Sequence, residues 1–386
     1  MKKSIEIDKH ILVLQFLGIL FVVFGHTQVN ILNFSGMFPY YSFHMPLWIF
    51  ISGYLFNTDK LDRFAVFIKK KTVKLLLPFY GWLLVYCILR YVFRLLGMIS
   101  YGKNPTLHNF FVMPWTKGCQ YGITSAWWFI PILFSIEIIC FFKEQIFSKI
   151  KKYCSVYRIL IFGLFVLIGM AAVYQARIVG SYQGMKEYQS YLCKVLFLLP
   201  FFDLGIIVKK YKSKIQNIKS IYYFGFILIL QIICIELSHN SISAEIVHSK
   251  YHTTPLITYI VAVNGIFLWF RISEILEPAL GKLKLVYEVG RNTWSILLHH
   301  QMIIFILNWS FVYIGKLVYR LAEIRIFDSI DIKKLISKPW YFCKSDELAK
   351  IYIIYAVVSV IGSLIIHNLV LRLKKSISIN KIKVKK

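Results

Sequence analysis

The chain has 386 residues, of which 58% are hydrophobic, and its mean hydropathy is +0.62. This composition is far more apolar than that of an ordinary soluble domain, so it argues against a soluble protein and indicates a membrane protein. The formal net charge of +28 would also suit a nucleic-acid-binding protein. However, the basic residues are concentrated between apolar stretches, so we expect no nucleic-acid partner.

Ten apolar stretches are long enough to cross a bilayer, which takes about 20 mostly apolar residues per helix. They lie at about 10–28, 38–56, 73–96, 124–142, 157–176, 190–208, 220–237, 255–271, 293–314 and 351–372. No internal repeat is visible, and no remaining segment is long enough for a separate core. The sequence therefore predicts an all-α, polytopic integral membrane protein with about ten transmembrane helices, formed by one domain over residues 1–386.

The distribution of basic residues predicts the orientation of these helices. With the N-terminus inside, 30 of the 46 Lys and Arg residues lie on the same side as that terminus. Eight of the others fall in one long connection at about 315–350, and long loops contribute little to orientation. We therefore expect a multi-pass protein of the bacterial cytoplasmic membrane with both termini cytoplasmic. Residues 373–386 would be a basic cytoplasmic tail, and 315–350 an extracytoplasmic connection. Basic clusters would also contact lipid headgroups.

Two histidines lie in the first two predicted helices. His26 is sixteen residues beyond His10, which is roughly 24 Å along a helix and so toward the outer leaflet. His44 lies about two turns below the same surface, because the second helix runs back inward. Ionisable groups inside a membrane helix are costly and usually functional, so this pair predicts proton-transfer chemistry at one depth. The alternative is a structural hydrogen-bonding role for each ring.

Charged and aromatic residues mark the third and fourth predicted helices. Lys71 and Lys74 are three residues apart, on one face at the cytoplasmic entrance, where two cations suit the phosphates of a cytosolic nucleotide-containing donor. The alternative is that they only set the topology. Trp128 lies at the outer end of the fourth helix, in the usual aromatic belt. Glu137 lies deeper, where a carboxylate costs on the order of 2.5–3.5 kcal/mol, so we expect it to be paired or to line a cavity.

The ninth predicted helix begins near Arg291 and Asn292 and carries His299 and His300 near mid-membrane. Adjacent residues of a helix diverge by about 100°, so these two histidines cannot both point at one site. No metal site is predicted. His248-x-x-x-His252 has helical ligand spacing but no obvious third ligand.

Several of these segments resemble acyltransferase family 3 membrane proteins. Leu17–His26 (LGILFVVFGH) resembles the first helix of that family. Phe43–Tyr54 (FHMPLWIFISGY) resembles the second-helix signature, especially that of the fucose 4-O-acetylase-like branch. Residues 128–131 and 290–300 fall where similar motifs are expected. The resemblance covers essentially the whole chain. It implies an integral-membrane O-acyltransferase that modifies bacterial surface polysaccharides with acetyl-CoA as co-substrate and no bound cofactor.

The same resemblance implies roles for individual residues. His26 matches the catalytic histidine of the family, and Lys71 and Lys74 stand at its basic R-x-x-R site. The family also keeps a basic residue eleven positions before the catalytic histidine, where this chain has Gln15. Eleven residues are three helical turns, so Gln15 lies about 16 Å below His26 on the same face. Its amide can hydrogen-bond the donor but supplies no charge.

These features lead to one expected mechanism and two alternatives. We expect a neutral His26 to accept a proton from a sugar hydroxyl of a polysaccharide or lipid-linked glycan as that hydroxyl attacks acetyl-CoA. His44 or Glu137 would orient the ring or shuttle its proton. Residues expected to contact the acceptor or line the pore are Trp128, Arg291, Asn292 and His300. The alternatives are a proton-coupled transporter and, because of Arg320 and Arg325 in the long outer connection, a polysaccharide polymerase of the same pathway.

Overall fold

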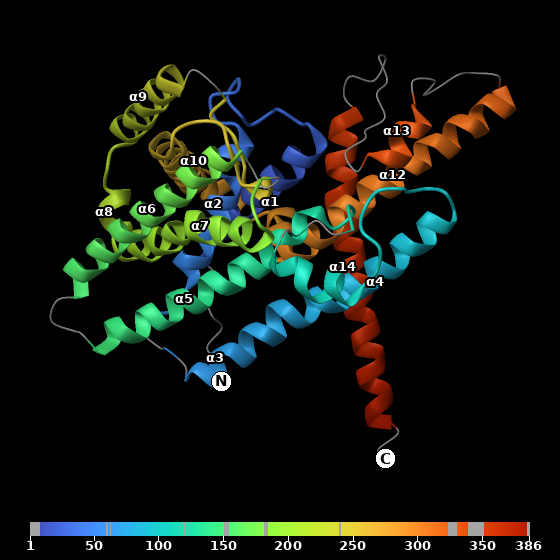
Figure 1. The fold of residues 1–386 in the computed structure, drawn as a ribbon, viewed down its shortest axis with the longest axis horizontal. Helices are drawn as coiled ribbons and strands as arrows, with labels where there is room; N and C mark the ends of the chain where they lie inside the picture. Colours follow the sequence, from blue (N-terminus) through green and yellow to red (C-terminus); the bar gives the residue numbers. More distant parts are fainter. Residues whose placement is uncertain are drawn as a thin grey trace.

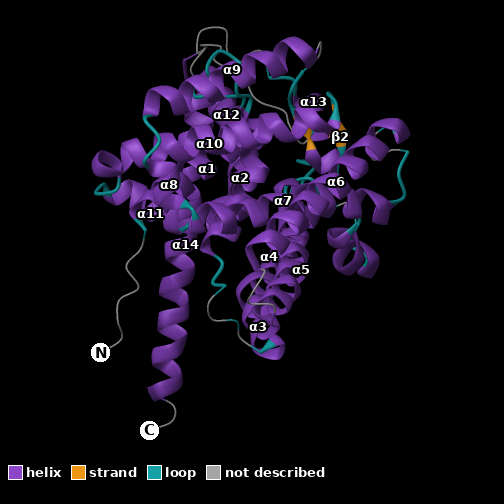
Figure 2. Cartoon of the chain, turned by 90° about the vertical axis from the view of Figure 1, so that its left-hand side faces the viewer, coloured by secondary structure: helices purple, strands orange, loops and turns teal. Residues whose placement is uncertain are grey.

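The computed structural model describes residues 8–58, 61, 63–116, 118, 121–149, 154–180, 184–238, 241–322, 330–338 and 351–383. These residues are almost all helical, as the colours of Figure 2 show. Nine helical segments in this part of the chain are long and apolar enough to cross a membrane. The prediction of an all-α, polytopic membrane protein is therefore confirmed.

The long helical segments follow the predicted order. They are α1 (Lys9–Thr27), α3 with α4 (Phe64–Lys71 and Leu77–Leu95), α5 (Phe129–Lys149), α6 (Cys154–Val179), α7 (Glu187–Lys210), α9 (Ser220–Ser238), α10 (Pro255–Leu280), α12 (Thr293–Ala322) and α14 (Ile351–Lys383). The remaining predicted segment, the second in chain order, is α2 (Tyr40–Leu55), whose 16 residues fall below the usual spanning length. Shorter elements are α8 (Lys212–Gln216), α11 (Lys284–Arg291), α13 (Ile332–Ser337) and a hairpin of β1 (Ala244–Glu245) and β2 (Lys250–Tyr251).

The described residues of the predicted long connection are partly helical. Helix α12 continues to Ala322 and so includes Arg320, and α13 lies within the connection. Residues 323–329, with Arg325, and 339–350 lie outside the described part of the chain.

The predicted C-terminal tail also begins as helix. Helix α14 runs on to Lys383, and Figure 1 shows its C-terminal half extending away from the other helices. Residues 373–383 contain neither Gly nor Pro, so nothing in their sequence interrupts the helix.

The centre of the protein is formed by α1, α2, α7 and α10, whereas α6 and α9 are mostly exposed. Helices α2 and α7 approach each other backbone to backbone at two glycines. A Cβ atom at Gly53 would clash with the carbonyl of Phe202, and one at Gly205 would clash with the carbonyl of Phe50. Small residues permit such close contact between membrane helices. These two glycines therefore allow α2 and α7 to pack backbone against backbone.

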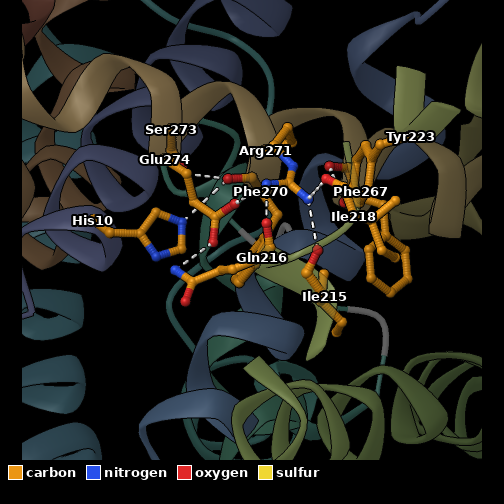
Figure 3. Close-up of polar contacts among 10 residues, drawn as sticks. All are labelled: His10, Ile215, Gln216, Ile218, Tyr223, Phe267, Phe270, Arg271, Ser273 and Glu274. Carbon is orange, nitrogen blue, oxygen red and sulfur yellow. Dashed lines mark hydrogen bonds and ion pairs between the residues drawn. The ribbon is translucent and has the colours of Figure 1, made fainter. Parts of the chain in front are cut away.

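Arg271 on α10 holds several elements together at one face of the protein (Figure 3). Its guanidinium donates to three carbonyls of residues 215–218, at 2.7 to 3.3 Å, and packs 4.4 Å from the ring of Tyr223. Beside it, the imidazole of His10 on α1 lies 3.1 Å from the carbonyl of Phe270. The cluster joins the start of α1 to the connection between α7 and α9.

Other segments predicted to be cytoplasmic meet at this same face. Lys212 forms an ion pair with Asp8 at 2.9 Å, and Lys209 donates to the carbonyl of Phe56 at 3.3 Å. One face of the protein therefore holds the N-terminal end of α1, the end of α2 and the α7–α9 connection. This agrees with the predicted topology, in which all three lie on the same side of the membrane. We refer to this as the cytoplasmic face; its orientation in the cell stays a prediction from the charge bias.

Candidate functional site

The predicted basic pair lies at a π-helical turn between α3 and α4. In this turn, Thr72–Leu76, a hydrogen bond joins the Thr72 carbonyl to the backbone amide five residues later. Pro78 explains the change of pitch, because it has no amide hydrogen to offer the carbonyl of Lys74 and its ring would crowd that oxygen. Such turns are rare and are frequently found at functional sites. Here the turn places Lys71 and Lys74 in the wall of one cavity.

This cavity, which we call the inner cavity, has a volume of about 310 Å³ and lies toward the cytoplasmic face. Lys71 forms an ion pair with Glu137 of α5 in its wall. Ser52 adds a hydroxyl, and its other lining includes Trp48, Leu133, Thr293 and Trp294. The cavity therefore combines two cations and one carboxylate with apolar and aromatic walls, a lining that suits a ligand with an anionic end and an apolar body.

A second cavity of about 470 Å³, the outer cavity, lies toward the opposite face. It is lined by His26 of α1 and by His44 and Tyr41 of α2, and Trp128 closes one side. The Tyr41 hydroxyl donates to the Gly25 carbonyl at 2.9 Å, which joins α1 to α2 beside His26. The structure thus brings the two predicted histidines to one cavity, as their matched depth required.

A third histidine, His300 of α12, lies directly against His26. The two rings stack with 5.2 Å between their centroids and 27° between their planes. His299, the adjacent residue, points elsewhere and bonds the hydroxyl of Tyr86 through Nδ1 at 2.7 Å. The predicted divergence of these two neighbours is confirmed.

Backbone carbonyls set the tautomers of the two histidines that accompany His26. Nδ1 of His44 lies 2.6 Å from the carbonyl of Tyr40, and Nδ1 of His300 lies 2.8 Å from the carbonyl of Ile296. A carbonyl only accepts, so each neutral ring carries its proton on Nδ1 and its lone pair on Nε2. Nε2 of His300 is buried and has no hydrogen-bond partner among the described residues. Two proton acceptors therefore accompany His26.

One face of α1 connects the two cavities. Gln15, Ile19, Val22 and His26 follow each other at helical spacing of three or four residues, so they form a single stripe. Ile19 and Val22 line the inner cavity, and Val22 and His26 line the outer one. Gln15 continues the stripe one turn further toward the cytoplasmic face, as the eleven-residue spacing predicted.

Glu137 does not lie where a partner of His26 would be. It lines the inner cavity and pairs with Lys71, whereas Trp128, nine residues earlier, lines the outer cavity. Nine residues are roughly 14 Å of helix, which carries the carboxylate away from the histidines. The expectation that Glu137 orients His26 therefore does not match its position, which is that of an ion-pair partner for Lys71.

Arg291 and Asn292 also differ from expectation. Arg291 ends α11 and bonds the hydroxyl of Tyr287, and the Asn292 amide donates to the carbonyl of Glu288 at 2.8 Å. These side chains bond within the end of a short helix and line neither of the two cavities. The lining is supplied by the next two residues, 293–294, which begin α12 and border the inner cavity.

The β1–β2 hairpin adds two groups to the outer cavity that sequence reasoning missed. Glu245 and His248 line it. Burial would raise the pKa of the Glu245 carboxyl, but the hydrogen bond from Lys250 at 3.0 Å and the proximity of His252 at 3.4 Å outweigh it, so this pKa is lowered. Burial lowers the pKa of His248. The only sequence signal was the spacing of His248 and His252, which is that of metal ligands on a helix but has no obvious third ligand. No group of three His, Cys, Asp or Glu residues in the described ranges could hold one.

A buried lysine lies beside Trp128, outside the set of residues that line the outer cavity. Lys194 of α7 is only 1% exposed, and its ammonium group lies 5.7 Å from the centre of the Trp128 ring. The attraction between this cation and the aromatic face helps to hold the Trp128 ring in place at the cavity wall.

A family model described as an acyltransferase domain matches residues 8–368, which is nearly the whole chain. No curated protein and no solved structure matches it.

Proposed function

The chain belongs to acyltransferase family 3, and from this premise we propose that it is a membrane O-acetyltransferase. It would transfer the acetyl group of cytosolic acetyl-CoA to a hydroxyl of a cell-surface polysaccharide or its lipid-linked precursor. We propose the bacterial cytoplasmic membrane as its location. The residues Phe43–Tyr54 support a place in the fucose 4-O-acetylase-like branch.

The observation that carries the proposal is the arrangement of the two cavities. The inner cavity offers Lys71 and Lys74 to a negatively charged donor, and the outer cavity is lined by His26 and His44. His300, which we expected to line the pore, is not among the lining residues and instead stacks on the ring of His26. The α1 stripe runs from one to the other. A donor from the cytoplasm and an acceptor on the opposite side can therefore approach the same short segment, and bringing reactants together accounts for much of enzymatic rate enhancement.

In the proposed reaction His26 acts as general base. Its neutral imidazole accepts the proton of the acceptor hydroxyl while that oxygen attacks the thioester carbonyl carbon. A carbon–oxygen bond forms, the carbon–sulfur bond breaks, and the thiolate takes the proton from the imidazolium. The products are an acetyl ester and CoA with a free thiol. General-base catalysis contributes typically 10²–10⁴-fold to such a step.

The other residues have supporting roles. His300 would hold the His26 ring by stacking on it, and His44 would offer its Nε2 lone pair at the wall of the same cavity as His26. Lys71 and Lys74 would bind donor phosphates, and Glu137 would keep Lys71 at the cavity wall before the donor arrives. Gln15 would hydrogen-bond the pantetheine arm. Trp128 would contact the acceptor from the outer side, since aromatic faces pack against the apolar faces of sugars.

The test is O-acetylation of the surface glycan, measured by NMR before and after mild alkali. Cells would carry wild type, His26→Ala, His299→Ala or no protein. His299 is the matched control, because it is a buried histidine beside His300 that faces Tyr86. We expect alkali-labile acetate with wild type and His299→Ala and none with His26→Ala. Acetate in the His26→Ala cells would overturn the assignment of the base. No acetate with wild type would overturn the acetyltransferase proposal and favour a transporter or polymerase.

A further inference from the structure

In the part of the chain that the structure describes, three side chains border both cavities. Val22, Met45 and Leu297 line the inner cavity and also line the outer one. They are only 2%, 5% and 9% exposed, so they fill the space between the cavities instead of leaving an open channel. We call these three residues the apolar layer.

Each residue of the apolar layer lies on the same helix as one of the three histidines His26, His44 and His300, and close to it in sequence. Val22 lies four residues before the histidine of α1, and Leu297 lies three residues before the histidine of α12. Met45 directly follows the histidine of α2, which runs in the opposite direction. Each of the three helices therefore contributes one histidine and, next to it on the cytoplasmic side, one apolar side chain.

We propose that the apolar layer is the acyl-selectivity filter of this enzyme, which admits a small unbranched acyl group such as acetyl and rejects branched ones. This inference rests on the proposed function, because it concerns the donor of that reaction. Attack requires the thioester carbonyl carbon to come within about 3–3.5 Å of the acceptor oxygen. A donor that enters from the inner cavity must therefore pass its acyl end through the layer to reach His26.

The chemistry of the three side chains suits this task. Met45 is unbranched with three rotatable bonds, so it can move aside. Val22 is β-branched and has one strongly preferred rotamer, so on the α1 side it limits the width available to the acyl group. A linear acyl group is no wider than the pantetheine arm that follows it, whereas a branched group must displace an additional side chain from a tightly packed layer. The closed layer also keeps water in the outer cavity away from the thioester.

The selectivity can be measured in inside-out membrane vesicles, which expose the cytoplasmic face to added donor and retain the native glycan. Vesicles from a strain that lacks the native gene and carries each variant would receive radiolabelled acetyl-CoA or isobutyryl-CoA, and label in the glycan would be counted. The variants are Met45→Ala and Leu297→Ala. The control is Leu47→Ala, because Leu47 is fully buried on the same helix as Met45 and lines neither cavity.

We expect wild type and Leu47→Ala to strongly prefer acetyl transfer. In Met45→Ala or Leu297→Ala the ratio of isobutyryl to acetyl transfer should rise about tenfold, the size of effect that one side-chain contact has on selectivity. The ratio does not depend on how much variant protein is folded. An unchanged ratio with acetyl transfer retained would overturn the filter. Absence of both transfers in wild type would instead contradict the proposed function.

A milder variant covers the case in which both alanine variants lose all transfer. Val22→Ala removes only two methyl groups, and it should raise the hydrolysis of acetyl-CoA by purified protein in the absence of glycan, because water then reaches the thioester. Hydrolysis equal to that of wild type would overturn the proposal.

Discussion

The ring of His300 on α12 stacks on the ring of His26 on α1, with centroids 5.2 Å apart. His300 is completely buried, and its Nδ1 is hydrogen-bonded to the Ile296 carbonyl of its own helix, so the orientation of the ring is fixed. Stacking restricts the rotation of the His26 ring, and the fixed tautomer presents a lone pair at Nε2. This relationship makes His300 a positioning residue for the proposed base.

Replacing His300 should therefore weaken catalysis without removing the base. His300→Phe keeps an aromatic ring but loses the Nδ1 hydrogen bond to the Ile296 carbonyl that fixes the ring. We expect kcat to fall about tenfold, equivalent to the loss of one hydrogen bond of about 1.4 kcal/mol. The pH dependence of kcat should change as well, because a titratable neighbour of His26 is gone. Steady-state kinetics across a pH series check this. A lower kcat with an unchanged pH profile would indicate a purely structural role.

Lys74 should contribute to binding of the donor rather than to the chemical step. Lys74→Ala removes a cation from the wall of the inner cavity, so the KM for acetyl-CoA should rise about tenfold while kcat changes little. Lys69→Ala is the control, because Lys69 is an exposed lysine of the same basic stretch and does not line that cavity. An equal rise of KM in both variants would mean that only the general positive charge of this face attracts the donor.

Gln15 should make a smaller contribution of the same kind. A neutral hydrogen bond stabilises by about 0.5–1.5 kcal/mol, so Gln15→Ala should raise the KM for acetyl-CoA roughly two- to tenfold with kcat retained. The comparison needs the same donor titration in purified protein. If kcat falls and KM stays constant, Gln15 acts through the packing of α1 and not through the donor.

The contact between α2 and α7 should tolerate no added methyl group at Gly53. Gly53→Ala would place Cβ against the carbonyl of Phe202, and overpacking of this kind costs about 1–3 kcal/mol. The melting temperature in detergent should fall. Gly81→Ala on α4 is the matched control, because nothing lies within 4 Å of its added Cβ. Equal melting temperatures for the two variants would show that α2 and α7 can separate without cost.

The β1–β2 hairpin should loosen in acid. The pKa of Glu245 is lowered in the folded protein from its usual value of 4.5, so its interactions with Lys250 and His252 stabilise the hairpin above that value and are lost as the pH falls through the folded pKa. Hydrogen exchange of residues 244–251, corrected for the intrinsic rate, should therefore increase at acidic pH. Glu245→Gln should remove this dependence. If the variant keeps it, another group controls the hairpin.

Part of the candidate site could be predicted because helical geometry is local. The spacing of Gln15 and His26 places them on one face of any α-helix, and the same geometry sends His299 and His300 apart. Pro78 was a visible signal for the π-helical turn, since a proline disturbs the carbonyl four residues earlier. The position of Glu137 was not predictable in this way, because its distance from His26 depends on how α5 lies against α1.

The sequence by itself determined that this protein is a bundle of membrane helices. Long apolar stretches in a bilayer must satisfy their backbone hydrogen bonds internally, and a helix does this using only local contacts. It also determined which residues of a helix share a face, and its motifs identified the family. Only the tertiary structure decided which helices are neighbours. The histidines of α1, α2 and α12, the Lys71–Glu137 pair, the hairpin at the outer cavity and the apolar layer all depend on side-chain packing between segments far apart in the chain, and periodicity within one segment carries no information about its neighbours.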